Sequence, residues 1–208
     1  PQYTFTLPEY QMASGIFDMM SHLMEAYFSG TDDAATDYLI EGLLCSIITS
    51  AKAAMQDPEN YEARSNLMWS STLAMNPLMG LSKKQDWEVH MIEHQLGAYT
   101  DCAHGMGLAA VSLPYYRYVC PYGLEKFVRF ARNVWKIDGQ GKSKLEIAQA
   151  GIDALESFMQ ECKIVTRLSE LGATQAMLPL IADSTVILDG GYKQLSKEEI
   201  LEILKTAY

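Results

Sequence analysis

Apolar residues recur at the three- and four-residue spacing of an α-helix along nearly all of this 208-residue chain. The final segment adds a capping box, Ser196-x-x-Glu199, before an apolar stripe. We therefore predict an all-α fold, a helical bundle in which residues 1–208 form a single domain. Helices are expected over residues 8–28, 31–54, 61–75, 87–99, from 104 onward, 122–135, 143–162, 175–182 and after 196.

Local signals refine these boundaries. Thr31 is suited to cap the second helix, and Asp32 and Asp33 suit its positive end. Pro114 lies inside the helical pattern that begins near His104, so we expect a kink or an end there. Residues 76–85 contain proline, glycine and serine and are predicted to form a loop.

Strand signals are almost absent. Residues 3–7 alternate between polar and apolar side chains, but five residues without a partner cannot form a sheet. We expect an extended tail there and interpret the chain as a piece of a longer protein.

The segment from Gly105 to Ala110 matches a dinucleotide-binding fingerprint, G-x-G-x-x-G/A. That fingerprint requires a preceding parallel strand, and residues 97–103 do not form a convincing one. We interpret Gly105 and Gly107 instead as positions where helices pack closely and leave room around His104.

Charge excludes several classes of function. Sixteen basic and 26 acidic residues give a formal net charge of −10, which disfavours binding to nucleic acids and anionic membranes. No run approaches 18 consecutive apolar residues, so no transmembrane helix is predicted, and the first residues do not resemble a signal peptide. The four cysteines form no C-x-x-C pair, which favours a reducing, cytoplasmic location.

The four histidines carry the strongest functional signal. Asp18 and His22 are four residues apart in a predicted helix, so their side chains leave the same face one turn apart. His90 and His94 repeat this spacing on another helix, and His104 follows beside a glycine. One carboxylate and several imidazoles without a thiolate suit Fe(II), Zn, Co, Ni or Mn in an open, catalytic site.

Each pair alone is more typical of a salt bridge or of a satisfied polar pair. The helix around Asp18 and His22 is otherwise apolar, however, and buried polar groups need partners. Spacing therefore leaves two interpretations open, a metal site and a metal-free helical interaction module. A metal-dependent hydrolase is a third, with Glu25 and Glu93 as the nearby candidates for a general base.

At these residues the sequence resembles the iron-containing (group III) alcohol dehydrogenase family and, within it, the butanol dehydrogenase-like branch. One matching segment runs from Pro8 through Asp18-x-x-x-His22-x-x-Glu25. The other runs from His90-x-x-x-His94-x-x-x-Ala98 to His104-Gly105. The match is weakest at Cys102, where the family commonly has threonine or a branched aliphatic residue.

The resemblance implies the helical, metal-binding C-terminal domain of a two-domain enzyme, and it extends over essentially all 208 residues. The N-terminal NAD(P)-binding domain would be absent. The metal ligands would be Asp18, His22, His90 and His104, with Fe(II) favoured and Zn(II) also accepted. His94 would lie near the nicotinamide as the catalytic and cofactor-binding residue, because histidine exchanges a proton near neutral pH. Glu25, seven residues after Asp18 on roughly the same helix face, could steady a ligand or form a plain salt bridge.

The implied reaction interconverts primary alcohols and aldehydes. The metal would polarise the substrate oxygen, and NAD(P) would carry the hydride. We expect this chain to be inactive without its cofactor domain. We also expect it to self-associate, because removing that domain uncovers apolar surface.

Overall fold

The computed structural model describes residues 1–30 and 34–208, and these residues contain helices but no β-strand. The all-α prediction is therefore confirmed for this part of the chain. The predicted caps on residues 31–33 lie outside the described residues. The helices are α1 (Glu9–Tyr27), α2 (Ala34–Gln56), α3 (Tyr61–Ala74), α4 (Glu88–Thr100), α5 (His104–Val119), α6 (Leu124–Asn133), α7 (Lys144–Glu161), α8 (Leu178–Ser184) and α9 (Lys197–Ala207).

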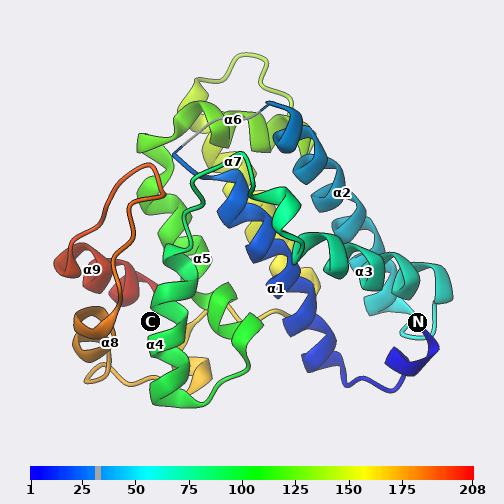
Figure 1. Cartoon of the computed structure of the whole chain (residues 1–208), viewed down its shortest axis with the longest axis horizontal. Helices are drawn as coiled ribbons and strands as arrows, with labels where there is room; N and C mark the ends of the chain where they lie inside the picture. Colours follow the sequence, from blue (N-terminus) through cyan, green and yellow to red (C-terminus); the bar gives the residue numbers. More distant parts are fainter. Residues whose placement is uncertain (31–33) are drawn as a thin grey trace.

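Two helices organise the bundle. Helix α1 packs against α2 and α3 on one side and against α5 on the other (Figure 1). Helix α5 in turn contacts α4, α7 and α9, so it joins the two halves of the molecule. Both helices are buried over most of their length, as their nearly continuous apolar sequences require.

The helix ends follow from local sequence. Ser196 and Glu199 form the predicted capping box of α9, in which each side chain binds the other residue's backbone N–H. Ser143 and Glu146 form a second capping box at the start of α7. These caps satisfy N–H groups that no preceding turn can bind.

The structure decides between two alternatives at Pro114 only in part, and it corrects the prediction for the first residues. Helix α5 does not end at Pro114 but continues to Val119, because proline removes one hydrogen bond while buried neighbours hold the helix. The first residues are not an extended tail, since Gln2–Thr4 form a 3₁₀ helix. The guanidinium of Arg64 fixes this turn by donating to the Thr4 carbonyl oxygen and, at 3.0 Å, to its hydroxyl.

Helix α2 is long and apolar enough to cross a membrane, with a mean hydropathy of 1.3. A core helix of a soluble protein passes the same test, and α2 carries two buried carboxylates, Asp37 and Glu41. Asp37 pairs with Lys83 at 2.7 Å and with Arg129 at 3.3 Å, and Glu41 pairs with Arg129 at 2.5 Å. These ion pairs attach α2 to α6 and to the loop before α4.

Candidate metal centre

Helix α1 presents the first pair of candidate ligands. Asp18 and His22 lie one turn apart, with Asp18 Oδ1 3.5 Å from His22 Nε2. The neighbouring residues Phe17, Met20 and Leu23 are fully buried and fix the rotation of the helix about its axis. The predicted common face of Asp18 and His22 is therefore present.

A close crossing of α5 over α1 brings the third candidate to this pair. A Cβ atom on Gly105 would lie 2.0 Å from the carbonyl oxygen of Ser14, so only glycine fits at this crossing. The preceding residue, His104, is the first of α5, and its Nε2 lies 3.8 Å from Asp18 Oδ1. The predicted role of Gly105 in close packing is confirmed.

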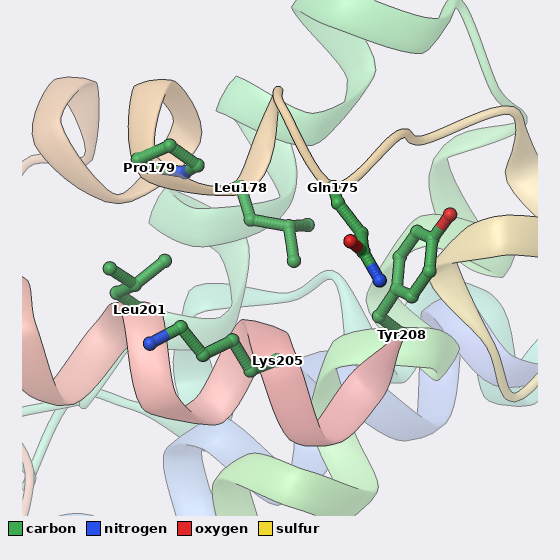
Figure 2. Close-up of a pocket in the computed structure, with 6 residues that line it drawn as sticks. All are labelled: Gln175, Leu178, Pro179, Leu201, Lys205 and Tyr208. Atoms are coloured by element: carbon green, nitrogen blue, oxygen red, sulfur yellow. The ribbon is translucent and has the colours of Figure 1, made fainter.

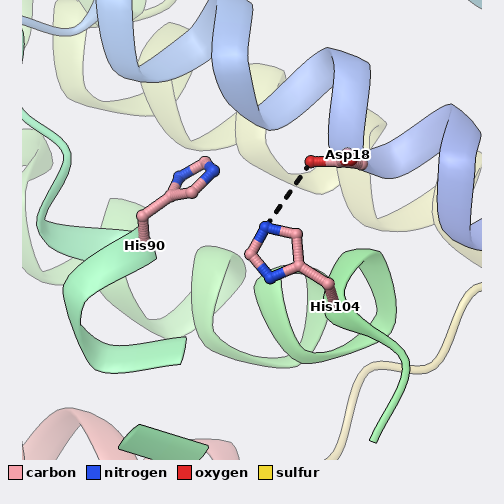
Figure 3. A group of neighbouring side chains, drawn as sticks. All are labelled: Asp18, His90 and His104. Atoms are coloured by element: carbon pink, nitrogen blue, oxygen red, sulfur yellow. Dashed lines mark ion pairs between the residues drawn. The ribbon is translucent and has the colours of Figure 1, made fainter. Parts of the chain in front are cut away.

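Helix α4 supplies the fourth candidate. One ligand atom each from Asp18, His90 and His104 lies within 4.8 Å of the others. In Figure 3 the rings of His90 and His104 and the carboxylate of Asp18 point toward one common space from three helices. Residues that are 86 positions apart in sequence (18 to 104) thus converge on one centre.

His22 borders this group without belonging to it. Its ring centroid is 4.8 Å from that of His90, and its only ion-pair partner within the described chain is Asp18. The structure brings all four predicted ligands together, but only three of them satisfy the mutual 4.8 Å spacing.

Two buried atoms in this centre have no hydrogen-bond partner among the residues that the structure describes. They are Asp18 Oδ1 and His90 Nε2. An unpaired buried polar atom costs free energy comparable to a lost hydrogen bond, and both atoms are good ligands for a divalent cation. The donor set, one carboxylate and imidazoles without sulfur, therefore fits a catalytic metal ion.

Buried carboxylates contact two of the imidazoles at their Nδ1 atoms. The Nδ1 atom of His90 contacts Glu25 Oε1, which also accepts a hydrogen bond from Ser21 at 2.9 Å. The Nδ1 atom of His104 lies 2.5 Å from Glu93 Oε2. When each Nδ1–H donates to its carboxylate, each Nε2 presents a lone pair to the common space.

Burial controls the ionisation of these groups. It raises the pKa of Glu25 to about 8, and it lowers the pKa of His90 to about 4 together with the nearby positive charge of His104. The hydrogen bond that His104 donates to Glu93 raises the pKa of His104, whereas burial lowers the pKa of His22. A charged Glu25 is thus costly unless a positive charge lies nearby.

Two further carboxylates lie close to Glu25. Burial raises the pKa of both Asp86 and Glu88 to about 7. Asp86 accepts a hydrogen bond from the Tyr115 hydroxyl, and Glu88 accepts one from the backbone of Leu188 at 2.8 Å. No lysine or arginine is seen within ion-pair distance of Asp86, Glu88 or Glu25 among the described residues, so this region is electrostatically suited to a cation.

His94 has a different environment. It is exposed on α4, and its ring stacks against that of His104 with centroids 5.8 Å apart. Its ligand atom belongs to a second group with Glu93 and His104 rather than to the group around Asp18. His94 therefore lies at the rim of the centre, where its ring is accessible to solvent.

Two pockets border the candidate ligands of α1. A pocket of about 330 Å³ between α1 and α3 reaches Asp18 and is lined largely by apolar side chains, including Met12, Met19 and Leu67. A second pocket, of about 260 Å³, reaches His22 and Trp87. Substrate-sized space therefore adjoins both α1 candidates.

A larger pocket of about 450 Å³ lies elsewhere, between α8 and α9 (Figure 2). Its only charged lining side chain is Lys205, which pairs with Glu202 at 2.7 Å. It lacks a cluster of titratable groups, so we do not place the chemistry there.

Sequence reasoning missed two residues of this centre and found a third. The contact of Glu25 with a ligand was anticipated, but Glu93 was considered only as a general base. Both carboxylates are occupied with histidines, which argues against the hydrolase interpretation. Trp87 gave no sequence signal, although its ring lies against His22 and His90.

The comparisons with known proteins agree on one family. Residues 12–208 match the model of the Fe-containing alcohol dehydrogenase family, C-terminal part. NADH-dependent butanol dehydrogenase A of Clostridium acetobutylicum is 40% identical over 100% of this chain and 55% of its own length. NADPH-dependent aldehyde reductase YqhD of Escherichia coli is 33% identical over 87% of this chain and 46% of its own length.

Solved structures give the same result. The substrate- and cofactor-free form of YqhD superposes on all of this chain and on 56% of its own, with a TM-score of 0.92 and 30% identity. The NADH-dependent butanol dehydrogenase A of Thermotoga maritima has a TM-score of 0.92 and 32% identity, over 100% of this chain and 54% of its own. The chain thus spans about half the length of these relatives.

Proposed function

Because the chain belongs to the Fe-containing alcohol dehydrogenase family and matches its C-terminal part, we propose that it is the metal-binding domain of an NAD(P)-dependent dehydrogenase acting on primary alcohols and aldehydes. The observation that carries this proposal is the pair of buried ligand atoms that accept no hydrogen bond within the described residues, Asp18 Oδ1 and His90 Nε2, beside His104. A metal-free interaction module has no use for such a pair, which would only cost stability.

Asp18, His22, His90 and His104 would hold the cation, with Fe(II) favoured by the family and Zn(II) compatible with the same ligands. When bound, the cation supplies Lewis acidity toward the alcohol or carbonyl oxygen, and NAD(P) supplies the hydride acceptor or donor. Glu25 and Glu93 keep the imidazoles of His90 and His104 oriented.

His94 would exchange the proton that alcohol oxidation releases. Its place at the rim, stacked on His104, keeps it close to the centre while its ring stays accessible to solvent. An imidazole can both accept and donate a proton near neutral pH, as a reversible reaction requires.

The substrate would be a small primary alcohol or the corresponding aldehyde. Butanol and aldehydes appear in the names of the relatives, and the pocket beside Asp18 offers apolar walls for an alkyl chain. Because the chain spans about half of each relative, the nucleotide-binding part would lie outside these 208 residues. The 208-residue chain by itself would not reduce aldehydes with NAD(P)H, and measurable turnover would contradict this.

Metal content tests the central proposal. The chain is purified without added metal, loaded with Fe(II) or Zn(II), desalted and measured by elemental analysis beside the variants His104→Ala and His94→Ala. We expect about one metal per chain in the parent and in His94→Ala, and a clear loss in His104→Ala. Equal metal content in all three chains, or none in the parent, would contradict the proposal.

A further inference from the structure

The backbone of Trp87 adopts an unusual conformation. It lies just before α4 with φ 60° and ψ 8°, in the left-handed region that bulky residues rarely enter. Its side chain makes no capping hydrogen bond to the helix, so capping does not explain the conformation. Such a residue persists where the surrounding contacts hold it, and these conformations cluster at functional sites.

The contacts of its indole ring supply a reason. Trp87 meets the ring of His22 edge-on, with centroids 5.1 Å apart and an interplanar angle of 77°, and meets His90 at 4.8 Å and 81°. His22 and His90 meet each other at 4.8 Å and 77°. Each ring of this three-ring cluster therefore restricts the rotation of the other two.

His22 depends on this cluster more than the other imidazoles do. His90 and His104 are each held by a buried carboxylate. Within the described chain, the polar partner recorded for His22 is Asp18, which is itself a candidate ligand. The pocket of about 260 Å³ that both Trp87 and His22 line would give the imidazole room to turn away if the indole were removed.

We propose that Trp87 is a positioning residue that holds the imidazole of His22 toward the cation, in the role that Glu25 and Glu93 have for His90 and His104. This inference rests on the proposed metal site. It gives a reason for the left-handed conformation at the start of α4, since this backbone turn places the indole against His22 of α1 and His90 of α4.

A double-mutant cycle between Trp87 and His22 tests it. Co(II) is titrated into the 208-residue chain and followed by absorption for the parent, Trp87→Leu, His22→Ala and the double variant. We expect Trp87→Leu to weaken Co(II) binding by about 10- to 100-fold. In the His22→Ala background the same substitution should change Co(II) affinity by no more than about twofold, because the imidazole that Trp87 positions is absent. Trp87→Phe keeps a ring in place and should restore most of the affinity.

Several results would overturn the inference. One is that Trp87→Leu weakens Co(II) binding equally in the parent and in the His22→Ala background, which would indicate a general structural role. Another is unchanged Co(II) affinity in Trp87→Leu. If Trp87→Leu does not fold by circular dichroism, Trp87→Met enters the same cycle with the same expectations. If the parent chain binds no Co(II), the proposed metal site is contradicted. If the parent binds Co(II) but the effects of Trp87→Leu and His22→Ala on affinity simply add, only the role of Trp87 is contradicted.

Discussion

Glu93 Oε2 lies 2.5 Å from Nδ1 of His104, so a carboxylate on α4 orients an imidazole at the start of α5. Glu93→Gln keeps the shape of the side chain but removes its charge. We expect it to weaken divalent-metal affinity by about 10- to 100-fold, measured by titration with Zn(II) against a chromophoric competitor. Glu62→Gln, an exposed position on α3, is the matched control and should leave affinity unchanged. Unaltered affinity in Glu93→Gln would show that this contact does not orient His104.

Gly107 lies against Glu93 and leaves no room for a side chain. An added Cβ would lie 2.7 Å from Glu93 Oε1 and 2.8 Å from its Cγ. Gly107→Ala should therefore cost about 1–3 kcal/mol in the free energy of unfolding, measured with urea, and should also weaken metal binding. Gly42 lies on α2, and a Cβ atom added there would meet no atom within 4 Å. Gly42→Ala should therefore stabilise the chain by about 0.5–1 kcal/mol. If Gly107→Ala and Gly42→Ala changed the free energy of unfolding in the same direction, this explanation would be refuted.

The buried ion pairs of Asp37 predict a large stability effect. Asp37→Ala would remove the buried carboxylate that pairs with Lys83, Lys126 and Arg129, while Arg129 would keep its pair with Glu41. We expect a loss of about 3–5 kcal/mol in the free energy of unfolding. Lys205→Ala breaks only an exposed pair with Glu202 and should change stability by less than about 0.5 kcal/mol. A loss below about 1 kcal/mol for Asp37→Ala would argue against a structural role for these ion pairs.

Asp86 predicts a pH dependence of stability. Burial raises its pKa from the ordinary 3.8 to about 7, so between these values the folded state binds more protons than the unfolded state. The stability that Asp86 contributes is thus complete below about pH 4 and is lost as the pH rises to 7. Asp86→Asn keeps an acceptor for Tyr115 but cannot titrate. Relative to the parent, the variant should gain stability with rising pH, by at most about 1.4 kcal/mol per pH unit.

Urea unfolding of the metal-free parent and of Asp86→Asn between pH 4 and 7, with a chelator present, measures this difference. A stability difference that stays constant over the whole range would mean that Asp86 is ionised in the folded chain throughout.

Most helices could be predicted from sequence because periodicity and caps act locally. The helix predicted over residues 61–75 is observed at Tyr61–Ala74, and the Ser196 capping box begins the last helix as predicted. The turn at Gln2–Thr4 was missed because it depends on Arg64, about 60 residues away. Helix α5 continues past Pro114 for a similar reason, since the packing of neighbouring helices overrides a local helix breaker.

The candidate site was only partly accessible from sequence. Spacing predicted that Asp18 and His22 share a helix face, because that depends on one helix alone. Their meeting with His90 and His104 depends on how α1, α4 and α5 cross, and only the family resemblance supplied it. The contact of Glu93 with His104 and the left-handed backbone of Trp87 depend on the same crossings and left no recognisable pattern in the sequence.

The glycine crossing of α5 over α1 has a consequence for engineering. Because the backbones touch at Gly105 and Ser14, main-chain contact rather than side-chain length sets the distance between Asp18 and His104. A larger residue at position 105 would push α1 and α5 apart. Such a substitution would change the spacing of the candidate ligands Asp18 and His104 without altering the two groups themselves.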